Sequence, residues 1–136
     1  MPTTTANITL SSADLTGDAL SLSTTTTLTK AGTTSGLDQT TGVGRKTTSA
    51  TSDVTLFTAT EYTDDKAHKI YIKNTSTVDS EYITVKVASQ ELGRLYAGDW
   101  MFIPWSADTT STDSNIVYTP SVATQLTIEY ALIFEA

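Results

Sequence analysis

Threonine is the residue that most limits how this chain can fold. The sequence contains 30 Thr and 14 Ser among 136 residues. A β-branched Thr side chain favours extended backbone, and its hydroxyl group tolerates water on an exposed strand face. No window of about a dozen residues places apolar side chains at helical spacing without Thr, Ser or Gly interrupting it. The sequence therefore predicts an all-β protein with almost no helix.

The chain changes character near Asp53. Residues 1–52 contain no Phe, Tyr or Trp, but they hold five of the seven glycines and 24 Thr or Ser residues. Such a segment can anchor to another surface but cannot build a core of its own. Residues 53–136 hold every aromatic side chain, in short alternating runs typical of a sandwich. We therefore predict an extended Thr/Ser-rich N-terminal arm with short strands over 1–52. A single antiparallel β-sandwich, jelly-roll-like, is expected over 53–136.

Alternating apolar residues give the expected strands of the sandwich. In 68–74, Ile70 and Ile72 share one face, and the final run places five large apolar side chains on one face, which indicates a central strand. Two of the runs flank Ala97-Gly98-Asp99 and are predicted to pair as a hairpin. The expected strands are 53–59, 68–74, 81–88, 91–96, 100–105, 116–119 and 125–135.

The strand from Trp100 to Trp105 is apolar on both faces, so both must be covered. Pro104 cannot donate a ladder hydrogen bond, which places it at a sheet edge or strand end. A neighbouring subunit can cover this strand, and so can the second sheet and the arm of the same chain. Aromatic and Met side chains are enriched at protein interfaces, which favours the subunit. The candidate interface residues are Leu95, Tyr96, Trp100, Met101, Phe102, Ile103 and Trp105.

The arm contains few side chains that can anchor it. Its scattered apolar residues alternate in places, which indicates short strands, and a basic pair near its end can meet an acidic partner surface. We expect the arm to be ordered mainly by contact with another molecule. The candidate arm anchors are Ile8, Leu10, Leu15, Leu20, Leu22, Leu28, Arg45 and Lys46.

Residues for catalysis or metal binding are scarce. His68 is the single histidine, and no nucleophile-elbow pattern accompanies it, so we interpret it as a partly exposed residue at a strand edge. The acidic clusters 64–65 and 108–113 lack the alternating Asp/Asn and Gly pattern of a calcium loop, and 42–47 lacks the spacing of a phosphate loop. The chain has no cysteine, so it forms no disulfide bond and no thiolate metal site. We therefore expect no enzyme activity, no cofactor and no metal.

Charge is distributed unevenly along the chain. Residues 1–52 carry three acidic and three basic side chains, whereas residues 53–136 carry 12 acidic and five basic ones, which accounts for the net charge of −7. An acidic body repels nucleic acid, so we expect no direct nucleic-acid binding. The sequence has neither a signal-peptide pattern at its start nor an apolar run long enough to cross a bilayer, so we expect no classical secretion and no membrane partner.

Four features together resemble the small virion structural proteins of tailed bacteriophages, in particular capsid cement or decoration proteins. They are the Thr-rich start, KIYIKNTS (69–76), ELGRLYAGDWMFIPW (91–105) and QLTIEYALIFE (125–135). The resemblance implies a β-sandwich that forms a homo-oligomer, most often a trimer, on the outer surface of the capsid. It also implies that the major capsid protein is a partner and that an extended terminal segment reinforces the contacts. A carbohydrate- or receptor-binding sandwich of a tail, neck or fibre is the alternative, in which Trp100, Trp105 or a loop Tyr stacks on a sugar.

Overall fold

The computed structural model describes residues 2–15 and 17–136, and it confirms the all-β prediction. These residues form eleven strands and one turn of 3₁₀ helix, Ala59–Glu61. The strands are β1 (Thr5–Ser12), β2 (Leu20–Thr27), β3 (Gln39–Thr40), β4 (Gly44–Thr48), β5 (Val54–Phe57), β6 (His68–Asn74), β7 (Ile83–Val87), β8 (Gln90–Leu95), β9 (Trp100–Trp105), β10 (Ile116–Pro120) and β11 (Leu126–Phe134).

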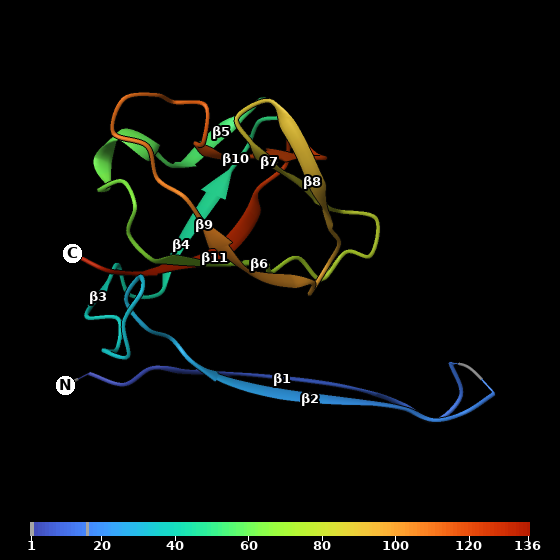
Figure 1. Cartoon of the computed structure of the whole chain (residues 1–136). Helices are drawn as coiled ribbons and strands as arrows, with labels where there is room; N and C mark the ends of the chain where they lie inside the picture. The colour runs from blue at the N-terminus through green and yellow to red at the C-terminus, as the bar shows by residue number, and fades with distance from the viewer. Residues whose placement is uncertain (1, 16) are drawn as a thin grey trace.

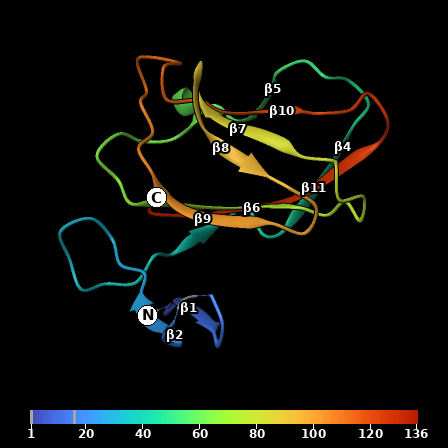
Figure 2. The same cartoon turned by 90° about the vertical axis from the view of Figure 1, so that its right-hand side faces the viewer.

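Strands β3 to β11 form a sandwich of two antiparallel sheets (Figures 1 and 2). One sheet has the order β5-β10-β7-β8. The other is five-stranded: β11 lies between β6 and an edge formed by β3 and β4, and β9 is the opposite edge. The predicted single antiparallel sandwich is therefore confirmed, and β11 is a central strand as expected.

The strand pairing is that of a jelly roll. β4 pairs with β11, β5 with β10, β6 with β9 and β7 with β8, so the chain makes one long antiparallel ribbon that turns back between β7 and β8. The ribbon is rolled up because β11 also pairs with β6, and β10 with β7. Rolling places alternate strands in opposite sheets, and side chains of both inner faces then share one core.

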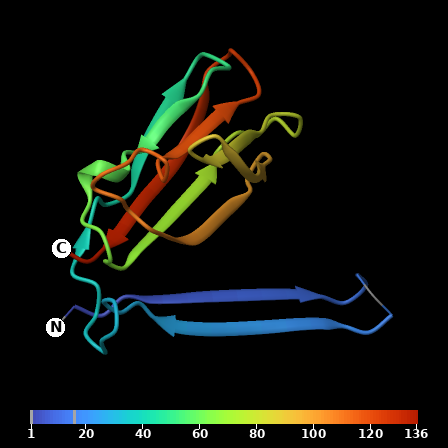
Figure 3. The ribbon, with the colours of Figure 1, turned by 45° about the horizontal axis from the view of Figure 1, so that its top comes forward.

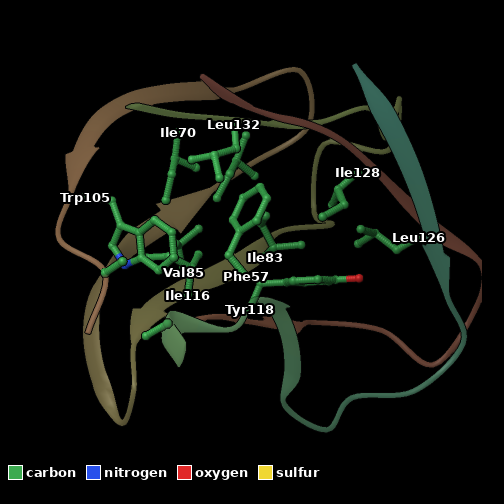
Figure 4. Close-up of a cluster of buried hydrophobic side chains, with 13 residues drawn as sticks. Phe57, Ile70, Ile83, Val85, Trp105, Ile116, Tyr118, Leu126, Ile128 and Leu132 are labelled. Carbon is green, nitrogen blue, oxygen red and sulfur yellow. The ribbon is translucent and has the colours of Figure 1, made fainter. Parts of the chain in front are cut away.

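The core lies between the two sheets and draws on nearly every strand of the body (Figure 4). The alternation expected for 68–74 and 125–135 is confirmed, because Ile70, Ile72, Ile128 and Leu132 are fully buried. The core cluster is Phe57, Ala59, Ile70, Ile72, Ile83, Val85, Trp105, Ala107, Ile116, Tyr118, Leu126, Ile128 and Leu132.

The predicted hairpin of β8 and β9 is wrong. β8 pairs with β7 in one sheet, and β9 pairs with β6 in the other. Gly98 adopts a φ of 80°, which permits a tight turn, but this turn carries the chain from one sheet to the other. It is fixed to the end of β6, where Gly98 N–H donates to the Asn74 carbonyl and Asn74 N–H donates to the Asp99 carbonyl, both at 3.0 Å.

The predicted boundary between arm and body, at residue 52, is also wrong. β3 and β4 lie inside the segment assigned to the arm, yet both pair with β11. The Thr48 hydroxyl lies 2.6 Å from the Tyr118 hydroxyl in the opposite sheet, so β4 closes one side of the sandwich. A segment without aromatic residues is sufficient here because none of the β4 side chains is fully buried and extended backbone suits its threonines.

The remaining N-terminal strands form a separate two-stranded sheet. β1 and β2 pair over their full length, from Thr5 opposite Thr27 to Ser12 opposite Leu20. This β1–β2 hairpin crosses beneath the five-stranded sheet and continues well beyond the edge of the body (Figures 1 and 3). The short strands expected in the arm are thus two paired strands of eight residues each.

Candidate functional site

The β1–β2 hairpin has one apolar and one polar face. Side chains alternate along a strand, and the register places Ala6, Ile8 and Leu10 on the same face as Leu20 and Leu22. The opposite face carries only Thr, Asn and Ser, and the hydroxyl of Thr25 donates to the side-chain amide oxygen of Asn7 there at 2.7 Å. The hairpin is therefore amphipathic, although it has no core of its own.

The apolar face of the hairpin looks toward the outward face of the five-stranded sheet. On that face the register aligns three rows that run across β11, β6 and β9. Most of these side chains are apolar, and two lysines of β6 lie among them. We define the outer sheet face as Ile133, Lys69 and Pro104 in the first row, Ala131, Tyr71 and Phe102 in the second, and Lys73 and Trp100 in the third, beside Glu129.

A groove separates the two surfaces near the base of the hairpin. It has a volume of about 310 Å³, and Ala6 and Ile8 line one side of it while Tyr71, Phe102 and Ile133 line the other. A second hollow of about 230 Å³ continues beneath Phe102 and is bounded by Thr24 and Thr26 of β2. The proximal half of the hairpin thus faces the body across a partly filled apolar space.

The distal half of the hairpin has no such cover. Leu10, Leu20 and Leu22, which we call the overhang leucines, are 52%, 40% and 46% exposed. Leu15, in the turn between the two strands, is 71% exposed. Burial of one such side chain is worth about 1.5–3 kcal/mol relative to full exposure, so three adjacent exposed leucines indicate a binding surface.

The base of the hairpin is packed against the body. Leu28 and Leu37 are buried, Leu28 N–H donates to the Thr4 carbonyl at 2.8 Å, and Leu37 N–H donates to the Leu28 carbonyl at 3.0 Å. A Cβ atom at Gly36 would lie 2.1 Å from the Pro2 carbonyl oxygen, so only glycine allows the N-terminal segment to lie there. The hairpin therefore starts from a fixed segment, which we call the platform: residues 28–37 together with Pro2 and Thr4.

Glu135 joins this platform to the sandwich. Its carboxylate, 9% exposed, accepts a hydrogen bond from Ala31 N–H at 2.9 Å and forms an ion pair with Lys66 at 3.2 Å. It also accepts a longer bond of 3.4 Å from Ala67 N–H. Chiefly through the Ala31 N–H, and also through Lys66 and Ala67, these partners lower the pKa of the carboxyl from its ordinary value of 4.5. The sequence pattern does not single out Glu135, because a glutamate at a chain end is usually solvated.

The candidate interface residues divide between the two faces of β9. Met101, Ile103 and Trp105 point inward and belong to the core of this same chain, as does Leu95 of β8. Trp105 is therefore not available to a partner, and the other three are partly covered within the chain, so the predicted interface is corrected for this inward face. Phe102 is half-buried on the outer sheet face, whereas Tyr96 and Trp100 are 44% and 50% exposed.

The candidate arm anchors also take different positions. Ile8 is half-buried beside the groove, and Leu28 is buried in the platform, so these two anchor the hairpin to its own chain. Arg45 pairs with Glu129 of the adjacent strand at 3.3 Å, and Lys46 belongs to the same edge strand. The basic pair is thus part of the sandwich and not of the arm, which corrects its assignment.

His68 is buried and not partly exposed as predicted. It is 1% exposed and lies among Tyr62, Trp105 and Phe134, with the Phe134 ring stacked on it at 6.1 Å. The ring atom Nδ1 lies 2.9 Å from the Lys66 carbonyl and donates to it, whereas the buried Nε2 has no hydrogen-bond partner among the described residues. Burial lowers the pKa of the imidazole from its ordinary value of 6.5.

Sequence reasoning missed half of the outer sheet face. Tyr71, Ala131 and Ile133 lie in the runs 68–74 and 125–135, at the positions between the predicted core residues. The signal was present, because these positions are apolar where a solvated face would carry polar side chains. A strand with apolar residues at both odd and even positions needs cover on both faces, and this holds for β11 as well as for β9.

Other searches of the described part of the chain add no second site. Over residues 2–15 and 17–136, no three side chains of the metal-binding types are grouped closely enough to hold an ion. The same ranges include no helix with the length and apolarity needed to span a bilayer. Comparisons with models of protein families, with curated proteins and with solved structures give no match. The function is therefore inferred from the hairpin and the outer sheet face.

Proposed function

We propose that this chain is a structural protein of a virion, a decoration protein that binds the outer surface of an assembled phage capsid and stabilises it. It acts as a homo-oligomer, with a trimer as the expected stoichiometry, and its second partner is the major capsid protein. The hairpin extends the reach of each subunit beyond its own body. No chemical step is involved, so the chain is not an enzyme in this proposal.

One observation carries the proposal: the apolar face of the hairpin continues beyond the body that could cover it. Isolated two-stranded hairpins are at best marginally stable in water, and a flat apolar face is a site for protein contact. The 16 residues of β1 and β2 carry no charged side chain. An uncharged hairpin can lie against a protein surface of either sign without repulsion.

The carbohydrate-binding alternative is weakened by the position of the tryptophans. Trp105 lies in the core, and its indole N–H donates to the Ser114 carbonyl at 2.7 Å. Of the two tryptophans, Trp100 keeps an exposed ring, and it lines the groove beside the hairpin; the exposed loop residue Tyr96 contacts Tyr82. A sugar platform usually needs an aromatic face with polar groups around it, whereas most of the groove lining is apolar.

The test uses expanded empty shells of the virus that encodes the chain, prepared without it. The full-length chain is expected to co-sediment with the shells and to raise the temperature at which they rupture. A variant lacking residues 1–27 keeps the platform residues Leu28 and Leu37 and is expected to stay soluble but to bind at least tenfold more weakly. Full-affinity binding by the truncated chain contradicts a role for the hairpin. Absence of binding by the intact chain contradicts the proposed function.

A further inference from the structure

We propose that the overhang leucines are covered by a second copy of this chain. Each subunit places the distal half of its hairpin, which we call the overhang, on the outer sheet face of its neighbour, against Tyr71 and Trp100. This inference deepens the proposed function and rests on it only in requiring an oligomer. It names the contact that builds the oligomer, so the hairpin supports shell binding by assembling the subunits, and the contact forms without a shell.

The apolar face of the hairpin is continuous from its base to its turn. Ala6 and Ile8 near the base face Phe102 and Pro104 of the outer sheet face in the same chain. The same face of the hairpin continues without interruption into the overhang leucines. A surface suited to the first half of this face therefore exists in every copy, and the second half presents larger side chains of the same chemistry.

The outer sheet face, which is the acceptor surface, is incompletely covered by the hairpin of its own chain. Trp100 is half exposed, and the groove between it, Tyr71 and Ile8 remains open. Two strands about 4.8 Å apart make a ribbon about half as wide as four strands, so one hairpin does not cover this sheet. An overhang from a second copy can occupy the uncovered part beside the hairpin that already lies there.

The charges of the outer sheet face and of the hairpin turn are complementary. Lys69 and Lys73 project from the outer sheet face, and neither forms an ion pair within residues 2–15 and 17–136. The turn of the hairpin carries Asp14. When an overhang lies on the neighbouring sheet, this carboxylate approaches a surface with two lysines, whereas the body as a whole is acidic. A contact with an arbitrary part of the acidic body lacks this complementarity.

Geometry also favours exchange between identical copies. Each subunit donates one overhang and receives one, so the contact is made as many times as there are subunits once the ring closes. In a closed ring each subunit takes part in two such contacts, one through its overhang and one through its outer sheet face, so ring closure adds to the strength of the single contact. Ring closure also leaves no overhang unpaired, which prevents open-ended assembly.

The stoichiometry of the isolated chain is the first test. Sedimentation velocity at about 50 µM is expected to show a closed oligomer of the full chain. The triple variant Leu10→Thr/Leu20→Thr/Leu22→Thr keeps β-branched side chains on the strands and is expected to be a monomer with an unchanged near-ultraviolet circular dichroism spectrum. The matched control Thr9→Ser/Ser21→Thr/Ser23→Thr alters the polar face and is expected to remain an oligomer. A monomeric wild type, or an oligomeric triple variant, overturns the proposal.

The absence of cysteine allows a direct test of the contact. Leu20→Cys and Tyr71→Cys are made in separate chains, mixed, and treated with a short bis-maleimide linker, so that a mixed dimer can only be an intermolecular product. The expected result is a covalent dimer that contains both variants. Ser21→Cys, on the opposite face of β2, replaces Leu20→Cys as the control and is expected to give at least tenfold less product. Equal yields from the two faces overturn the proposal.

Complementation separates this contact from a direct pairing of two overhangs. Trp100→Thr damages the acceptor, and the triple leucine variant damages the donor, so each alone is expected to be a monomer. Mixed together, they retain one intact donor and one intact acceptor, and a heterodimer is expected. If Trp100→Thr remains oligomeric, the acceptor is wrong and the proposal falls. Shell binding by a monomeric wild type would refute this inference and the expected homo-oligomer but leave shell decoration standing. An oligomer that does not bind shells would support this inference and refute the proposed function.

Discussion

The sandwich and the hairpin are built from the same kind of strand but differ in what covers them. Both are antiparallel, and both present an apolar face that must be covered. In the sandwich a second sheet supplies the missing layer, so that Leu132 is fully buried, whereas Leu22 of the hairpin keeps 46% of its surface exposed. A sequence pattern thus fixes which face must be covered, and the chain itself need not provide the cover.

The difference also explains where function is expected. Side chains that meet the core are constrained by packing and contribute mainly to stability. The overhang leucines contribute little to the stability of the single chain because they stay in contact with water. A surface that gains nothing from the fold of its own chain is the part of the molecule free to be selected for binding.

The largest effect should come from applying one substitution to both regions. Leu132→Ala removes a fully buried side chain and is expected to lower the free energy of unfolding by about 2–5 kcal/mol. Leu22→Ala is expected to change it by no more than about 0.5 kcal/mol when the chain is measured as a monomer. Denaturant unfolding followed by tryptophan fluorescence measures both. Similar losses for the two variants would show that the hairpin is packed as tightly as the core.

Lowering the pH is expected to have a smaller effect on stability, and this effect arises in the sandwich. Because burial lowers the pKa of His68, the native state favours the neutral ring, and this contribution is complete above pH 6.5. It is lost as the pH falls from 6.5 through the lowered native value, since the unfolded chain then binds a proton that the native ring resists. The nearby Glu135 carboxylate opposes the shift, and Lys69 adds to it.

The measurement is the thermal midpoint between pH 7.5 and 5. The wild-type midpoint is expected to fall over this range, and that of His68→Phe, which keeps the aromatic contacts, is expected to fall less. The strands of the hairpin contain no ionisable side chain, so they contribute nothing to this slope. Identical slopes for the two proteins would remove His68 as the cause.

Much of the sandwich could be predicted from the sequence, because period-two alternation reports burial directly. Ile70, Ile72, Ile128 and Leu132 were placed correctly on this ground. The partner of each strand could not be predicted in the same way. A Gly-containing turn such as the one at Gly98 can close a hairpin or carry the chain between sheets, and the choice depends on distant strands.

The candidate site was predicted in outline only. The sequence indicated that β9 needs cover on both faces, but it gave no means of telling that Trp105 faces the core while Trp100 does not. Edge strand β4 was predicted as part of the arm because its segment is Thr/Ser-rich and has no aromatic residue, whereas its cross-strand neighbours lie about 80 residues away, as with Thr47 and Thr127. Long-range pairing of this kind leaves no mark in a local window.

The smallest expected effect lies at the junction of the two regions, at Glu135. Glu135→Gln removes the charge that holds Ala31 N–H and Lys66, so the platform should loosen while the core stays intact. Hydrogen–deuterium exchange is expected to speed up several-fold at Ala31 and Leu28 and to stay unchanged in β6. The control Glu129→Gln, in β11, breaks the ion pair with Arg45 and weakens the hydrogen bond from the Tyr71 hydroxyl, both away from the platform.

The pH dependence of the same junction provides a further check on the charge. The pKa of the Glu135 carboxyl is lower in the native state than its ordinary 4.5, so its contribution is complete above pH 4.5 and disappears as the pH falls through the native value. Exchange at Ala31 in the wild type should therefore rise below pH 4.5, after correction for intrinsic rates, and approach that of Glu135→Gln. If the wild type and the variant exchange alike at neutral pH, the carboxylate does not hold the platform, and Leu28 and Leu37 must fix the hairpin through packing alone.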